Sequence, residues 1–170
     1  MTTRQQRYEA LVNALHADVF RYAYWLVKDK AVAEDIVQET FLRAWKSLDS
    51  LKDDKAAKSW LITILRRENA RRFERKQFDL VDIDEVAVSD TQLSSDTELE
   101  HRELRRLMAG LSEEYREPLM LQILFGYSGE EIAAQLDLNK NTVMTRLFRA
   151  RNQIKEALEN PDNDREVKNG

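Results

Sequence analysis

The sequence predicts an all-α protein of two small helical domains joined by an acidic linker. Only four glycines and two prolines occur among its 170 residues, whereas sandwiches and barrels of short strands need frequent turn residues. Apolar residues recur every three or four positions through most of the chain, which is the spacing of amphipathic helices. Over residues 79–97 this spacing disappears and the composition becomes acidic. The chain is therefore expected to divide at this linker.

The first domain, residues 1–78, is expected to contain three long helices. The first of them covers about residues 3–27. The second follows Asp29, whose carboxylate can cap it, and ends near Leu48. After a loop, a third helix covers about residues 55–76, and the residues expected on its apolar side are Trp60, Leu61, Ile64, Leu65 and Phe73.

The second domain, residues 98–160, is expected to begin with two helices. A capping-box pattern at Ser95 starts the first of them. Ser112 precedes the second, and Gly126 ends it. Proline lacks a backbone N–H and crowds the preceding turn, so Pro118 predicts a kink in this second helix or a later start.

A helix-turn-helix is predicted over residues 128–158, with a capping box at Ser128, a turn at 137–139 and a longer second helix. The start of the second helix in this motif enters the major groove, where arginine can pair with guanine. A solvated basic face on an ordinary bundle is the alternative. The polar tail, residues 161–170, is expected to be disordered. The candidate DNA contacts are Lys140, Asn141, Thr142, Thr145, Arg146 and Arg149, with Arg151 further along assigned to phosphate.

The net charge of −4 conceals an uneven distribution. Residues 1–78 carry a net +5, residues 79–100 a net −8 and residues 101–170 a net −1. Basic residues concentrate at 66–76, with six Lys/Arg and two Glu, and at 140–155, with five Lys/Arg and no acid. The field at the contact surface governs DNA binding, so the acidic total does not exclude it. The acidic linker is either a solvated tether or a strap that passes through a basic channel of a partner.

Basic and aromatic residues share the third helix of the first domain. Arg67 and Arg71 are one turn apart, and Arg72 lies on the adjacent row. Trp60 stands near the start of this helix beside Ser59. Positive charge near an aromatic ring suits unpaired DNA, because the ring stacks on bases while the charge attracts the backbone. The alternative is that Trp60 belongs to the core and the arginines are solvated.

The second helix carries a polar face beside its apolar stripe. Asp35, Gln38, Glu39 and Leu42 fall at helical spacing on this face, which combines acidic and amide groups with an exposed leucine. A bare DNA-binding domain has no use for such a surface. A protein that binds a large basic partner does.

The chain offers no catalytic or metal site. It contains no cysteine, which excludes disulfides and thiolate chemistry. His16 and His101 are far apart in sequence, and neither a phosphate-binding glycine loop nor a nucleophile elbow occurs. No apolar run reaches the roughly 18 residues that span a bilayer, and no signal peptide is recognised. A cytoplasmic protein that is not an enzyme, does not insert into membranes and needs no cofactor or metal is expected.

Five segments resemble the sigma factors of bacterial RNA polymerase, in the same order and spacing. Residues 33–45, read as AEDIVQETFLRAW, resemble the second region of these proteins, and residues 59–64, read as SWLITI, resemble the promoter-melting segment that follows. Residues 111–117, 126–133 and 141–151 resemble the fourth region. The two regions are joined without a third domain, which is the pattern of the extracytoplasmic-function (ECF) branch of the sigma-70 family.

The resemblance implies a role for the first domain. Its second helix would contact the clamp helices of the polymerase β′ subunit through Asp35, Gln38, Glu39 and Leu42. Its third helix, with the loop before it, would recognise and open the −10 promoter element. The residues implied in that contact are Ser59, Trp60, Arg66, Arg67, Asn69, Arg71 and Arg72.

The resemblance also implies roles for the rest of the chain. The helices of the second domain would contact the β flap, and the linker would pass through the polymerase cleft towards the RNA exit path. An anti-sigma factor would mask these faces until a signal arrives. The residues implied in facing the −35 element are Thr145, Arg146, Phe148 and Arg149.

Four positions depart from the family pattern. Arg67 stands where many members carry asparagine, and Arg71 stands at a commonly polar or acidic position. Recognition of the −10 element is therefore expected to differ. Asp137 replaces a common glycine in the turn and tolerates left-handed geometry, and Met144 replaces a usual basic residue.

Two other functions remain open from the residues alone. One is a stand-alone helix-turn-helix regulator that binds duplex DNA without polymerase. The other is an interaction protein that binds no DNA. The polar face at Asp35, Gln38 and Glu39 favours the sigma factor over the regulator, because a stand-alone regulator has no polymerase to bind.

Overall fold

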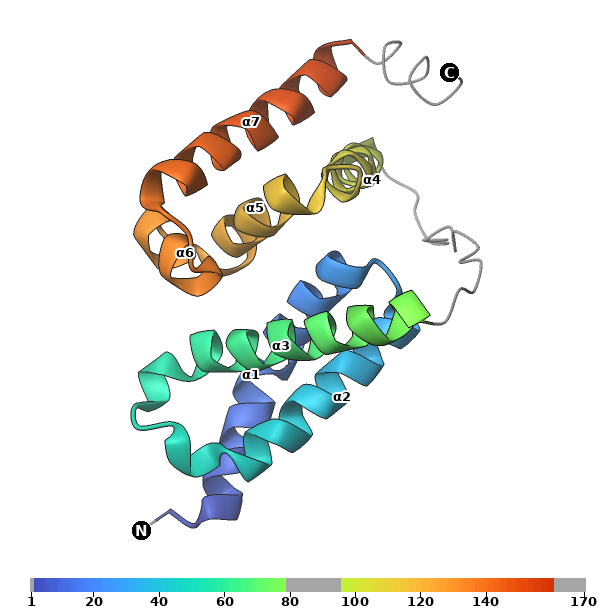
Figure 1. The fold of residues 1–170 in the computed structure, drawn as a ribbon. Helices are drawn as coiled ribbons and strands as arrows, with labels where there is room; N and C mark the ends of the chain where they lie inside the picture. Colours follow the sequence, from blue (N-terminus) through green and yellow to red (C-terminus); the bar gives the residue numbers. More distant parts are fainter. Residues whose placement is uncertain (1, 79–95, 161–170) are drawn as a thin grey trace. The chain divides into compact units, whose positions relative to one another are not determined.

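The computed structural model describes residues 2–78 and 96–160, and these separate into two compact helical units. No strand occurs in either range, so the prediction of an all-α protein is confirmed. The predicted linker at 79–97, most of the capping box at Ser95 and the tail after residue 160 lie outside the described residues. The helices of the first unit are α1 (Arg4–Val27), α2 (Lys30–Lys46), the short 3-10 turns η1 (Leu48–Ser50) and η2 (Asp54–Ala56), and α3 (Ala57–Phe78) (Figure 1). Those of the second unit are α4 (Asp96–Ala109), α5 (Glu113–Phe125), α6 (Gly129–Leu136) and α7 (Lys140–Glu159).

Side-chain caps define the helix starts of the first unit. The Thr3 hydroxyl oxygen accepts from the backbone N–H of Gln6 at 3.1 Å, and the Gln6 side-chain oxygen accepts from the backbone N–H of Thr3 at 3.0 Å. Asp29 accepts from the backbone N–H of Val32 at 3.1 Å, as predicted. Lys28 adopts a left-handed conformation with φ 56° and so ends α1 immediately before that cap. Two consecutive local signals therefore separate α1 from α2.

The three long helices of the first unit pack around a shared apolar core. Helices α2 and α3 run side by side in opposite directions, and α1 packs on both (Figure 1). The expected position of Phe73 on the apolar side of α3 is wrong, because this ring is 64% exposed. The largest buried side chains of the core include Val19, Tyr22, Leu48, Leu61, Ile62 and Leu65.

Arg7 anchors the loop that leads into α3. Its guanidinium donates to Asp54 Oδ1 from Nε at 3.0 Å and from Nη2 at 2.8 Å. The same Nη2 donates to the carbonyl oxygen of Leu51 at 2.6 Å. Paired charge-assisted bonds of this kind fix geometry as well as adding energy. The loop before α3 is thereby held against the start of α1.

Arg116 joins α4 to α5 in the second unit. It is only 6% exposed, and its Nη1 donates to the carbonyl oxygens of Leu111 at 2.7 Å and Ala109 at 3.3 Å. Burial lowers the pKa of Arg116 from its ordinary value, and nearby Glu113 and Glu117 oppose that shift. The arginine thereby satisfies carbonyls at the end of α4 that the helix itself leaves open.

Helix α5 contains Pro118 and neither starts later nor ends there. It begins at Glu113 and continues to Phe125 with the proline inside it, so of the two expected alternatives, a kink or a later start, the later start is wrong. Pro118 is buried, and its packing compensates for the backbone bond that proline cannot make. Gly126 ends the helix with φ 66°, as predicted.

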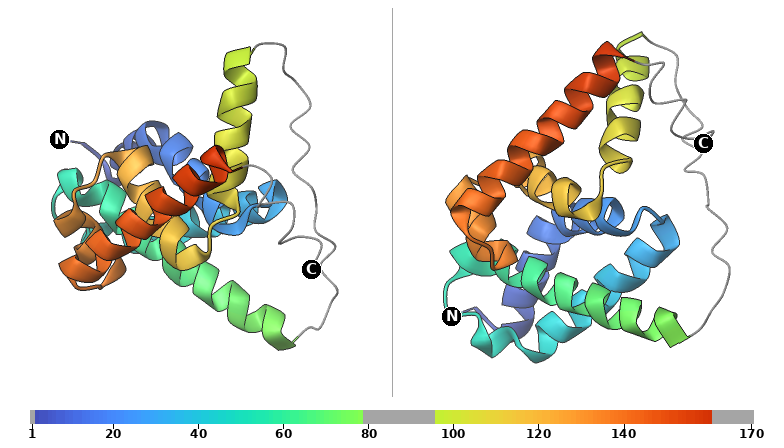
Figure 2. Two further views of the ribbon diagram at one scale, coloured as in Figure 1. Left: turned by 90° about the horizontal axis from the view of Figure 1, so that it is seen from above. Right: turned by 45° about the horizontal axis from the view of Figure 1, so that its top comes forward.

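The helix-turn-helix is present at the predicted position. The Ser128 capping box starts α6. Asp137 has φ 53°, and the following N–H of Leu138 donates to the carbonyl of Ala133 at 2.9 Å. Asn139 then caps α7 by accepting from the backbone N–H of Asn141 at 2.8 Å. Figure 2 shows α7 leaving this turn and reaching α4 at its far end.

None of the helices in the described parts of the chain is long and apolar enough to cross a membrane.

Candidate polymerase and DNA interfaces

The predicted polar face of α2 is open to solvent. Asp35 and Gln38 are exposed, Glu39 is half-buried, and Leu42 is 51% exposed. The opposite side of the helix is buried through Ile36 and neighbouring core residues. The apolar Leu42 thus stands among polar groups on a surface that the fold of this unit does not cover.

A groove of about 590 Å³ between α1 and α2 adjoins this face. Gln38 and Leu42 belong to both the groove and the polar face. Sequence reasoning missed the contribution of α1, although Val12, His16 and Phe20 recur at four-residue spacing. The full lining is Tyr8, Val12, His16 and Phe20 from α1 with Lys30, Glu34, Gln38, Phe41 and Leu42 from α2.

Two contacts with Phe41 join α1 to α2 beside the groove between these helices. The Tyr8 hydroxyl donates to the carbonyl oxygen of Phe41 at 2.8 Å. Burial raises the pKa of Tyr8 above its ordinary value. The His16 ring stacks on Phe41 with centroids 5.6 Å apart. Both contacts link a side chain of α1 to a residue of α2.

Ion pairs connect the polar face of α2 with charged residues of α3. Arg72 Nη1 lies 3.8 Å from Asp35 Oδ2. Arg43 pairs with Glu39 at 3.3 Å and also with Glu68 on α3. We call this set of pairs, together with the pair between Arg71 and Glu68, the α2–α3 ion-pair network.

Glu68 lies at the centre of this network and was not anticipated. It is 8% exposed, and Arg71 Nη1 donates to its Oε1 at 3.1 Å. A buried carboxylate requires such partners, because removing its charge from water is costly. The signal available in sequence was a lone glutamate among arginines three and four positions away.

The candidate −10 residues of α3 divide by exposure. Ser59, Arg67 and Arg71 are exposed, whereas Arg66, Asn69 and Arg72 are half-buried. Trp60 is half-buried as well, so its ring is neither sealed in the core nor fully presented. The structure thus places these residues along one helix but not on one face.

The candidate −35 residues gather at the start of α7. Lys140, Asn141, Thr145, Phe148 and Arg149 are exposed, while Thr142 and Arg146 are half-buried. A polar hollow of about 370 Å³ lies between this end of α7 and the start of α5, and Lys140 is outside it, paired with Glu130 at 3.1 Å. The hollow is lined by Glu114, Tyr115, Asn141, Thr142, Thr145, Arg146 and Arg149.

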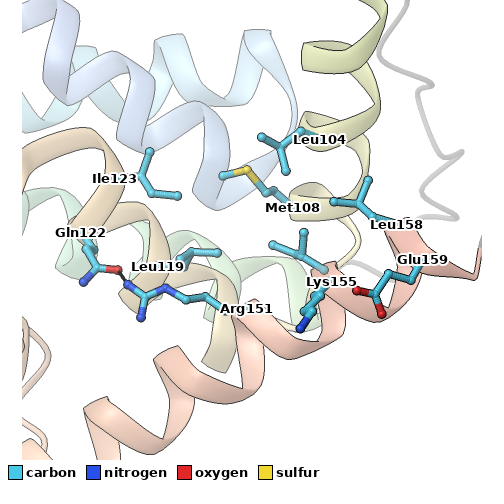
Figure 3. Close-up of a pocket in the computed structure, with 10 residues that line it drawn as sticks. Leu104, Met108, Leu119, Gln122, Ile123, Arg151, Lys155, Leu158 and Glu159 are labelled. Carbon is cyan, nitrogen blue, oxygen red and sulfur yellow. Dashed lines mark hydrogen bonds between the residues drawn. The ribbon is translucent and has the colours of Figure 1, made fainter.

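Arg151 lies apart from the other −35 candidates. It donates to the side-chain oxygen of Gln122 on α5 and borders an apolar groove of about 420 Å³ between α4, α5 and α7 (Figure 3). Ile123 is 55% exposed and Leu158 is 53% exposed in this groove. The lining is completed by Leu104, Met108, Leu119, Ile154, Lys155 and Glu159.

Within the two described ranges, no group of three or more His, Cys, Asp or Glu side chains is arranged to hold a metal ion. The surfaces described above consist of exposed polar, basic and apolar groups.

The comparisons with known proteins agree with this organisation. Residues 11–78 match the family description Sigma-70 region 2, and residues 101–154 match Sigma-70, region 4. The ECF RNA polymerase sigma factor SigL of Mycobacterium tuberculosis is 32% identical over 150 residues, covering 83% of this chain and 85% of the relative. The chain belongs to the ECF sigma factors. It is therefore a sigma factor that directs transcription initiation, and sigma factors are not enzymes in the catalytic sense.

Other relatives of this sigma factor cover nearly its whole length. The ECF sigma factor SigX of Bacillus subtilis is 26% identical over 165 residues, covering 91% of this chain and 85% of the relative. Among solved structures, the sigma factor RpoE of Bartonella quintana, in complex with the anti-sigma factor NepR, has a TM-score of 0.71 and 31% identity. The match covers 91% of this chain and 96% of that one. CnrH, in complex with the cytosolic domain of CnrY, has a TM-score of 0.65 and 25% identity, with 93% and 90% covered.

Proposed function

We propose that the polar face of α2 binds the clamp helices of the polymerase β′ subunit. Asp35, Gln38 and Glu39 supply hydrogen-bond acceptors for a basic partner, and Leu42 supplies an apolar contact one turn beyond Gln38. Interfaces of this kind place an apolar anchor within a polar rim. The groove between α1 and α2 continues this surface and extends the contact area.

We propose that α3 and the loop before it recognise and open the −10 element. The support is the concentration of arginines on α3 and the half-buried Trp60 near its start, where an unpaired base can stack. The Arg7 anchor holds the preceding loop in one position. Arg67 is exposed, so its guanidinium is available where many members of the family carry asparagine.

We propose that the start of α7 reads the −35 element in the major groove. In a helix-turn-helix this end of the second helix contacts base edges. Thr145 and Arg149 are exposed there, with Asn141 one turn earlier. Because Arg151 is held by Gln122 on the other side of the unit, we assign it to the edge of the apolar groove instead of DNA.

The apolar groove between α4, α5 and α7 is proposed as the surface for the polymerase β flap. Exposed Ile123, Leu104 and Leu158 line it, with Arg151 and Lys155 along one edge (Figure 3). Such a groove accepts the apolar face of a partner helix. A second unit tied to polymerase in this way would be positioned over the −35 element.

An anti-sigma factor is proposed as a further partner. The support is that RpoE, which this chain resembles over most of its length, is solved in complex with the anti-sigma factor NepR, while CnrH is solved in complex with the cytosolic domain of CnrY. A bound regulator would compete with polymerase for the polar face of α2 or for the apolar groove.

One observation carries the proposed function: a single chain presents a DNA-reading helix-turn-helix and an uncovered acidic face on a separate helical unit. The test is binding of the full chain to core RNA polymerase, followed by transcription from a promoter library. Asp35→Ala and Gln38→Ala are each expected to weaken core binding at least about fivefold, since interface residues that matter cost more than about 1 kcal/mol. Glu156→Ala, which removes an exposed carboxylate on α7, is the matched control.

Unchanged core binding in both α2 variants would refute the clamp assignment. The stand-alone regulator predicts a different result, in which the free protein protects a specific duplex tightly without polymerase. A sigma factor is expected to show promoter-specific protection only as part of the holoenzyme.

A further inference from the structure

Among the described side chains of the second unit, the large apolar ones that are exposed fall into two groups. Leu104, Ile123 and Leu158 line the apolar groove described above. Met144 and Phe148 stand apart from it on α7, with 48% and 65% of their surfaces exposed. We call these two residues the apolar pair.

The apolar pair lies on the flank of α7 that faces the start of α6. Met144 Sδ covers Gly129 so closely that a Cβ on this glycine would approach it to 2.6 Å. Phe148 follows Met144 by four residues and therefore lies one turn further along the same row. The methionine is thus supported by the fold, while the phenylalanine ring projects beyond it.

The other flank of α7 is basic. Arg146 and Arg149 line the polar hollow against the start of α5. Asn141 and Thr145 lie between the two flanks, because they are one turn apart on the outward side of the helix. The proposed DNA-reading face therefore has a polar middle, one basic flank and one apolar flank.

Only one feature of the base edges in the major groove is apolar. Thymine presents its 5-methyl group there, whereas the other bases present hydrogen-bond donors and acceptors. We propose that the apolar pair binds the methyl group of a thymine in the −35 element and makes that base a specificity determinant. This inference rests on the proposed role of α7 in reading the −35 element.

The geometry of the pair favours DNA as its occupant. Phe148 lies on the same outward side of α7 as Asn141 and Thr145, so a duplex that contacts those residues also covers the ring. Removing a methyl group from such a contact is expected to weaken binding roughly fourfold, which corresponds to about 0.8 kcal/mol for one buried carbon.

The test uses thymine and uracil, which differ only in the 5-methyl group. The full chain is assembled with core RNA polymerase, and its −35 element is selected from a random duplex library. Each thymine of the selected element is then replaced by deoxyuridine, and the ratio of the two affinities is measured for wild type, Met144→Ala and Phe148→Ala. Gln153→Ala, which changes an exposed polar residue on another side of α7, serves as the matched control.

The expected result is one position where uracil weakens wild-type binding about fourfold and where the loss falls towards unity in Phe148→Ala or Met144→Ala. The Gln153→Ala variant should keep the wild-type ratio. Three results would overturn the proposal. The thymine-to-uracil affinity ratio could be near unity at every thymine, the selected element could contain no thymine, or the ratios could be the same in all variants. The last outcome would assign the uracil effect to DNA shape.

Failure of the proposed function would give a different result. A chain that assembles with polymerase but selects no duplex element would remove the −35 role of α7, and this inference with it. A chain that selects an element without sensitivity to uracil would leave the sigma function intact and refute the inference alone. If the apolar pair instead binds a regulatory protein, Phe148→Ala would weaken that protein's binding and leave the uracil ratio unchanged.

Discussion

Replacing Glu68 with glutamine is expected to destabilise the first unit by about 2 kcal/mol. The glutamate is 8% exposed, accepts from Arg71 at 3.1 Å and pairs with Arg43. Hydrogen bonds to charged groups contribute roughly 1.5–3 kcal/mol, against roughly 0.5–1.5 kcal/mol for neutral ones. Glutamine keeps the shape and loses the negative charge, while the arginine donors stay charged, so each of the two contacts loses only part of its strength, about 1 kcal/mol. Partial exposure of both guanidiniums keeps the estimate at the low end.

Tryptophan fluorescence measures this change without interference from the second unit. All three tryptophans, Trp25, Trp45 and Trp60, belong to the first unit. Urea unfolding of the full chain, followed by this signal, therefore gives the free energy of unfolding of that unit alone. Glu74→Gln is the matched control, because Glu74 is an exposed glutamate on the same helix and its change should stay within about 0.5 kcal/mol.

Equal unfolding midpoints for Glu68→Gln and Glu74→Gln would refute the reasoning. A Glu68→Leu variant more stable than wild type would also refute it. An apolar residue can stabilise a fold more than a buried ion pair does, when the cost of desolvating the charges exceeds their attraction. That second outcome would mean that the α2–α3 ion-pair network is retained for a reason other than stability.

Three further predictions concern other parts of the chain. Arg149→Ala should weaken binding to the −35 duplex by about 1–3 kcal/mol while leaving core binding unchanged, as measured by gel shift of holoenzyme and by core titration. Arg116→Met should destabilise the second unit by about 2–3 kcal/mol, because the carbonyls of Ala109 and Leu111 lose a charged donor, and amide exchange across α4 and α5 would report it. Tyr8→Phe should cost about 1 kcal/mol through the lost bond to Phe41. Folding raises the pKa of Tyr8, so its contribution to the free energy of unfolding is full below about pH 10 and is lost as the pH rises further. The difference in stability between wild type and Tyr8→Phe should therefore shrink in alkaline unfolding experiments.

Local signals in the sequence predicted the helix boundaries well. The cap at Asp29, the capping box at Ser128, the left-handed Gly126 and the turn at Asp137 are all present where expected. Each depends on a few adjacent residues, so a single sequence contains the information. The helix through Pro118 was less predictable, because the cost of the proline is offset by tertiary packing that no local pattern reports.

The error at Phe73 has a physical cause. Apolar counting placed this ring inside, but the inward row of α3 continues from Leu65 through Glu68 to Arg72. That row follows helical spacing and ends in charged residues, which apolar counting does not recognise. For the same reason, apolar spacing gave no sign that Glu68 lies at the centre of the α2–α3 ion-pair network.

The proposed surfaces were predictable only in part. The polar face of α2 and the outward face of α7 follow from helical spacing within one element. The grooves do not, since each needs side chains from helices distant in sequence, such as Phe20 with Leu42 or Leu104 with Leu158. Arg151 shows the same limit, because its partner Gln122 lies 29 residues away.

The α2–α3 ion-pair network combines a weak outer pair with a buried inner contact. The pair between Asp35 and Arg72 spans 3.8 Å, and the Asp35 side chain is 69% exposed, so it is worth roughly 0.2–1 kcal/mol. A basic partner that binds Asp35 must break the pair with Arg72, and this lowers its affinity by less than about a factor of five. Glu68 is buried and keeps Arg43 and Arg71 in place during that exchange. The polymerase contact proposed for α2 and the −10 contact proposed for α3 can thus share one set of charges. Arg72→Ala should leave core affinity within about fivefold of wild type. A larger loss in core titration would show that the outer pair organises the polar face.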